Sequence, residues 1–125
     1  MERIASITRD TNETQISMSL NLDGSGRGNI NTGIGFFDHM LNSFARHGFF
    51  DLDLTVKGDL ETEMVREFFY AVSYGAEMNL HLKQLSGTNN HHIIEAAFKA
   101  FAKALDGAVA AEPRLSGVLS TKGSL

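Results

Sequence analysis

The sequence has no cysteine, no cluster of basic residues and no apolar run long enough to cross a bilayer. Without thiolates, any bound metal must be held by imidazole and carboxylate groups, which suit manganese, iron or zinc. The start of the chain lacks the layout of a signal peptide, which predicts a cytoplasmic protein without a membrane partner. The formal net charge of −4 argues against a nucleic-acid surface and favours small-molecule partners.

Hydrophobic patterning predicts the strands of a single domain that spans residues 1–125. Residues 15–22 alternate strictly between apolar and polar side chains, which is typical of a half-buried strand. A weaker strand at 4–8 could form a hairpin with it through the turn formers at 10–12. Residues 29–32 predict a short third strand, and 50–56 alternate clearly as a further one.

Helical periodicity appears in three other segments. Apolar residues at i, i+3, i+4 and i+7 predict a helix over 34–47, with Gly48 as its stop. A second helix is expected over 63–78 with Thr62 as N-cap, then a strand at 79–85, and a third helix that begins near His91. The tail after Ala111 is expected to be a loop. This order predicts an α+β fold, a mainly antiparallel or mixed sheet with helices packed on one face.

The residues with the clearest chemical meaning stand at the start of the third helix. Glu95 lies four positions after His91 and three after His92, so it can share a metal ion with either imidazole. The two adjacent histidines diverge by about 100° and so could serve two different metals. The alternative is a solvated first turn, with Asn90 as N-cap and Glu95 interacting with the helix dipole. The motif alone leaves both interpretations open.

The other three histidines carry less information when each is taken alone. His39 lies on the polar side of an apolar helix, where a histidine more often finds a hydrogen-bond partner than a metal. His81 faces away from the leucines of its expected strand. His47 suits a helix C-terminus, where the macrodipole favours a cation. Each has an ordinary structural explanation.

Five motifs together resemble a known family. In chain order they are Thr8-Arg9-Asp10-Thr11-Asn12-Glu13-Thr14, Thr32-Gly33-Ile34-Gly35-Phe36-Phe37-Asp38-His39-Met40-Leu41, Gly58-Asp59-Leu60, Asn90-His91-His92-Ile93-Ile94-Glu95-Ala96-Ala97-Phe98-Lys99-Ala100 and Ser120-Thr121-Lys122-Gly123. They resemble imidazoleglycerol-phosphate dehydratase of histidine biosynthesis. The resemblance implies a manganese-dependent hydro-lyase that dehydrates imidazole glycerol phosphate to imidazole acetol phosphate, with an internally duplicated fold and assembly into a homo-oligomer.

The resemblance also implies roles for particular residues. The expected ligands of two manganese ions are His39, His81, His91, His92 and Glu95. Glu13 and Glu95 would be the catalytic carboxylates, with Glu13 as a substrate contact and proton-transfer group. The remaining substrate contacts would be His39, His47, His91, Lys99, Ser120, Thr121 and Lys122. Lysine charge and hydroxyl donors suit a phosphate, although Lys122 without the resemblance would be a solvated tail residue.

One departure from the family pattern stands between Glu61 and Thr62. Residues 1–61 resemble the front of the family's first repeat, and 62–125 resemble the back of its second. A central segment with three expected metal ligands and the phosphate-binding arginines is therefore missing. The alternative function is a non-catalytic metal-binding or scaffold fragment of the same fold. Symmetric self-association could bring two copies of the His91, His92 and Glu95 motif together.

Overall fold

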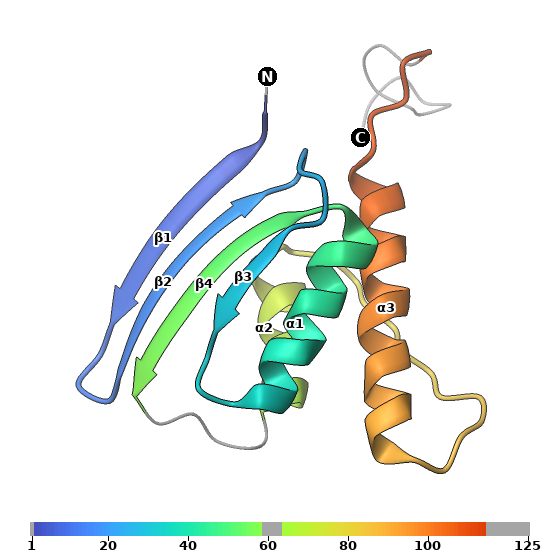
Figure 1. Ribbon diagram of the computed structural model, residues 1–125. Coiled ribbons are helices and arrows are strands. Elements are labelled where there is room, and N and C mark those ends of the chain that lie inside the picture. The colour runs from blue at the N-terminus through green and yellow to red at the C-terminus, as the bar shows by residue number, and fades with distance from the viewer. Residues whose placement is uncertain (1, 59–63, 115–125) are drawn as a thin grey trace.

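A four-stranded mixed sheet lies beside three helices (Figure 1). The computed structural model describes residues 2–58 and 64–114. Its elements are β1 (Ile4–Asp10), β2 (Thr14–Asn21), β3 (Gly28–Asn31), α1 (Gly35–Gly48), β4 (Asp51–Gly58), α2 (Met64–Gly75) and α3 (Asn90–Val109). The strand order is β1-β2-β4-β3, antiparallel except for the parallel pair β3 and β4. The predicted α+β class with a mixed sheet is confirmed.

The register of the sheet follows from the alternation in its strands. Met18 of β2 lies opposite Ile7 on one side and Leu54 on the other, so one apolar row crosses three strands. The leucines and the isoleucine of this face that pack against the helical core are Leu20, Leu22, Leu54 and Ile30. Every residue of β1 is exposed. The helices therefore cover the β3 and β4 side of the sheet and leave its β1 edge open to solvent.

The core lies where α1 and α3 run side by side with their N-terminal ends at the same end of the molecule (Figure 1). Met40, Phe50 and Phe98 are fully buried there. Phe44 of α1 stacks on Phe101 of α3 with ring centroids 5.6 Å apart. Burial of each such side chain contributes roughly 1.5–3 kcal/mol of transfer free energy. This packing fixes how far α1 and α3 are apart, and thereby the spacing of the side chains at their N-terminal ends.

Two predicted helix ends were wrong by one residue, for local reasons. Gly48 is the last residue of α1 rather than the first residue after it, and the left-handed position that ends the helix is Phe49, with φ 58°. A Cβ at position 48 would lie 2.3 Å from the ring of Phe50, so glycine makes room for that buried ring. The N-cap of α3 is Asn89 and not Asn90, because the Asn89 side chain accepts a hydrogen bond from the backbone N–H of His92.

The strand predicted at 79–85 is absent. This segment has no regular secondary structure, and α2 ends at Gly75 rather than near Met78. The apolar alternation is present, but a strand also needs a neighbour to satisfy its backbone, and the described residues provide none. The expected N-cap Thr62 and the tail residues Ser120, Thr121 and Lys122 lie outside the described residues. In the part of the chain that is described, no helix is both long and apolar enough to span a membrane.

Candidate metal centre

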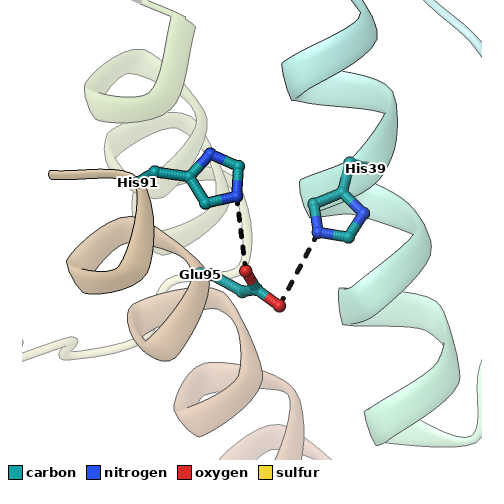
Figure 2. A group of neighbouring side chains, drawn as sticks. All are labelled: His39, His91 and Glu95. Atoms are coloured by element: carbon teal, nitrogen blue, oxygen red, sulfur yellow. Dashed lines mark ion pairs between the residues drawn. The ribbon is translucent and has the colours of Figure 1, made fainter. Parts of the chain in front are cut away.

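Two helices bring His39, His91 and Glu95 together (Figure 2). His39 lies in the second turn of α1, and the other two side chains lie one turn apart at the start of α3. Each helix start is fixed by a local hydrogen bond. Asp38 accepts one from the backbone N–H of Thr32 at 2.8 Å, and Asn89 accepts one from the N–H of His92 at 3.0 Å.

The carboxylate of Glu95 lies between the two imidazoles. His39 Nε2 is 3.6 Å from Glu95 Oε1, and His91 Nε2 is 3.5 Å from Glu95 Oε2. These separations are too long for hydrogen bonds. Two ligand atoms that each bind one ion at about 2.1 Å lie about 3.0–3.4 Å apart for angles between 90° and 109°. Both separations are slightly longer than this range and involve different oxygens of the carboxylate. One ligand atom of each side chain lies within 4.8 Å of the other two, so small side-chain rotations would bring two nitrogens and one oxygen to a single cation.

The three side chains differ in exposure. About half of the surface of each imidazole is exposed, against 21% of the Glu95 side chain. The rings of His39 and His91 stack at 5.9 Å, and Phe36 packs edge-on against His91 at 5.1 Å. The carboxylate is thus the sheltered member, and the imidazoles form an open rim. An ion held here would keep positions free for water or for a substrate atom.

Lys99 is the electrostatic partner of this group. Its ammonium lies 2.8 Å from Glu95 Oε1 as an i, i+4 pair on α3. The hydrogen bond from Lys99 is the main cause that lowers the pKa of Glu95, helped by the charge of Lys99 and by His39. Glu95 is therefore ionised at neutral pH, as a metal ligand must be. The same ammonium competes with any cation for the carboxylate.

The remaining predicted site residues do not join this cluster. His81 is exposed in residues 76–89, which link α2 to α3, and His92 places its ring edge-on to His91 at 5.9 Å. Neither belongs to the three-residue cluster found among the described residues. His47 lies near the opposite end of α1, where its Nδ1 is 2.8 Å from the carbonyl oxygen of Ser43. Glu13 is exposed in the turn between β1 and β2.

Three further residues shape the site without having been assigned a role from the sequence. Thr32 is buried and donates from its backbone and its hydroxyl to Asp38, which precedes His39. Phe36 supports the ring of His91. The threonine and aspartate are six positions apart across the helix start, so their contact can be recognised only once the helix boundary is known. The aromatic contact joins two helices, so no local pattern reports it.

Comparison with known proteins gives one consistent family. The imidazoleglycerol-phosphate dehydratase family model matches residues 32–63 and 57–105, two segments that share 57–63. An imidazoleglycerol-phosphate dehydratase of Lachnoclostridium phytofermentans is 42% identical over 195 aligned residues, covering all of both chains. One of Acetivibrio thermocellus is 38% identical over the same length and coverage. Since this chain has 125 residues, about 70 aligned positions of those relatives have no counterpart in it.

Solved structures give the same fold. A crystal structure of IGPD from Pyrococcus furiosus, described as a complex with (S)-C348, superposes with a TM-score of 0.77 at 24% identity, covering 95% of this chain and all of the other. The imidazoleglycerol-phosphate dehydratase of Staphylococcus aureus superposes with a TM-score of 0.72 at 25% identity, covering 83% of this chain and 96% of the other.

Proposed function

The chain belongs to the imidazoleglycerol-phosphate dehydratase family, and we propose that it is a hydro-lyase of histidine biosynthesis. Its substrate would be imidazole glycerol phosphate, and elimination of water would give imidazole acetol phosphate. The observation that carries this proposal is the convergence of His39, His91 and Glu95 from two helices, with one ligand atom of each within 4.8 Å of the other two. These residues stand in two of the motifs on which the resemblance rests.

Manganese is the proposed metal. Its donor set here is two imidazole nitrogens and one carboxylate oxygen, which suits first-row divalent ions and excludes a thiolate site. When bound, such an ion acidifies an imidazole that coordinates it, which favours loss of a ring proton from the substrate. His81 and His92 would serve a second ion, with further ligands from water, substrate or another chain. Self-association into a homo-oligomer is part of this proposal.

The side chains of the chain itself would divide the remaining work. Glu95, held ionised by Lys99, would orient the metal, and Glu13 would transfer the substrate proton. The turn that carries Glu13 lies toward the same end of the molecule as the N-terminal ends of α1 and α3 (Figure 1). Lys99 would bind the substrate phosphate, together with Ser120, Thr121 and Lys122 of the tail. His47, at the far end of α1, would contact substrate only in another chain's site.

A second candidate function rests on the length of the chain. The relatives carry about 70 aligned positions that this chain lacks, and the two family matches meet at 57–63. We place the missing segment between Glu61 and Thr62, where it would remove expected ligands and phosphate contacts. The chain would then bind metal without catalysing the dehydration, as a metal-binding or scaffold fragment of the fold.

One experiment separates the two functions. The purified chain is assayed for consumption of imidazole glycerol phosphate with manganese, after chelation, and as the variants Glu95→Gln and Glu112→Gln. The enzyme proposal predicts turnover that is lost on chelation and in Glu95→Gln but kept in Glu112→Gln, because Glu112 pairs only with Arg114 in the described residues. Manganese uptake without turnover selects the fragment function. A chain that takes up no manganese contradicts both.

A further inference from the structure

Among the described residues, the same unit of a helix and the turn after it occurs twice, and only the first unit leads into a strand of the sheet. Phe49 and Glu77 follow α1 and α2 in the left-handed region, with φ of 58° and 52°. The same backbone hydrogen bond closes each turn, from Phe50 N–H to the Ala45 carbonyl and from Met78 N–H to the Ser73 carbonyl, both at 3.0 Å. All these positions differ by 28 residues. Residues 78–85 therefore correspond to residues 50–57, which include most of β4.

The first unit shows what normally surrounds such a strand. β4 pairs with β2 in the antiparallel sense and with β3 in the parallel sense. The backbone that leads into β3 lies against the outer side of α1. A Cβ at Gly28 would lie 2.2 Å from the side-chain oxygen of Asn42, and one at Gly26 would lie 3.1 Å from the carbonyl oxygen of Arg46. Residues 26–31 thus cover the strand edge and the helix together.

The second unit has none of this cover among the described residues. Residues 78–85 pair with no strand, and the side chains of Leu82 and Leu85 are 47% and 86% exposed. Tyr70 and Tyr74 are the counterparts of Asn42 and Arg46 by the same offset of 28. They stack on each other with centroids 6.2 Å apart, and they are 67% and 76% exposed. The open face is defined here as Tyr70, Tyr74, Leu82 and Leu85.

An apolar groove borders the open face. It has a volume of about 450 Å³ and lies between residues 82–86 and the side of α3 that is turned away from α1. Its apolar lining is Leu82, Leu85, Ile93, Ala96, Ala97 and Ala100. In the first unit, Leu20 and Met18 of β2 lie opposite Leu52 and Leu54 of β4. A strand added beside Leu80 and Leu82 in the same way would place apolar side chains next to this groove.

We propose that the open face is a docking surface for a polypeptide that supplies a strand pair of the β2 and β3 kind. One strand would pair with residues 78–85 in the antiparallel sense and the other in the parallel sense, as in the first unit. The backbone hydrogen bonds would provide affinity, and the apolar groove and the two tyrosines would provide specificity. This surface is separate from the His39, His91 and Glu95 cluster and does not depend on the proposed activity.

The partner is the polypeptide that corresponds to the segment present in the relatives and missing here. About 70 aligned positions lack a counterpart, enough for several strands of the usual five or six residues. The two family matches meet at 57–63, directly before the unit that lacks its strands. A second copy of this chain is a poorer donor, because it would have to withdraw β2 and β3 from its own sheet.

The test uses the unmatched segment of the Lachnoclostridium phytofermentans relative, made as a separate polypeptide and mixed with the full chain. Titration calorimetry is expected to show a one-to-one complex. Amide hydrogen exchange at 78–85 should slow at least tenfold, because free amides become paired. Leu82→Asp should weaken the complex at least tenfold. Ile4→Asp, at a residue that is 55% exposed on the edge strand β1, should leave it unchanged.

Three results would overturn the proposal. The first is no binding by a chain whose circular dichroism shows that it is folded. The second is binding that Leu82→Asp and Ile4→Asp weaken equally, or that leaves exchange at 78–85 unchanged. The third is protection of 78–85 in the chain alone that rises with its concentration, which would assign the open face to a second copy.

Discussion

Replacement of Lys99 by methionine should make the chain bind a divalent cation more tightly. The ammonium of Lys99 is 2.8 Å from Glu95 Oε1, so an ion at the cluster would find a positive charge beside its carboxylate ligand. At a separation of roughly 5 Å and a dielectric constant of about 80, repulsion between a divalent ion and an ammonium weakens binding about tenfold. The Lys99 side chain is 41% exposed and can swing into solvent, which reduces the effect. We expect an affinity gain of about two- to tenfold.

The assay is calorimetric titration with manganese at low and high salt. Lys103→Met is the matched control, because Lys103 lies one turn further along α3, with its ammonium 4.5 Å from the ring centre of Phe49. Its affinity should equal that of the parent chain. The gain in Lys99→Met should shrink as salt screens the repulsion. An unchanged or weaker affinity in Lys99→Met would refute the idea that this ammonium and the metal compete for Glu95.

Three further predictions concern stability. Phe98→Ala should cost about 3–5 kcal/mol in urea unfolding, because the ring is fully buried, whereas exposed Tyr74→Ala should cost under about 0.5 kcal/mol. Arg3 lowers the pKa of Asp23 to about 2, below its ordinary value. The pair therefore stabilises the fold above about pH 4, and this stabilisation is lost as the pH falls toward 2. Arg3→Met should flatten this part of a curve of Tm against pH. Asn89→Ala should cost about 1 kcal/mol in the same urea assay, by removing the cap of α3.

Local patterns predicted most of the fold because they report directly on neighbours in the chain. Strict alternation in β2 and β4 gave both strands, and the helical stripe from Phe37 to Phe44 gave α1 to within a residue at either end. The same alternation at 79–85 gave a wrong prediction, because a strand forms only when a neighbouring strand provides hydrogen-bond partners for its backbone. Pairing partners are a property of the whole sequence, and here they are missing from the described residues.

Five candidate ligands could be predicted from the sequence, but not which of them would come together in the fold. Helical spacing alone places His91 and Glu95 close enough to be candidate ligands of one ion. His39 joins them, and His81 and His92 do not. This outcome depends on how α1 packs against α3 through buried aromatic rings. The ion pair between Lys99 and Glu95 could be predicted from their i, i+4 spacing on α3. That the Lys99 ammonium would compete with a metal ion for Glu95 follows only from the structure, which places both imidazoles beside the same carboxylate.

A crystal of the chain soaked in manganese tests the metal centre most directly, because anomalous scattering locates the ion. The account predicts a peak about 2.0–2.2 Å from the Nε2 atoms of His39 and His91 and bound to the carboxylate of Glu95, absent from crystals of Glu95→Gln. A peak at other residues, or the same peak in Glu95→Gln, would contradict it.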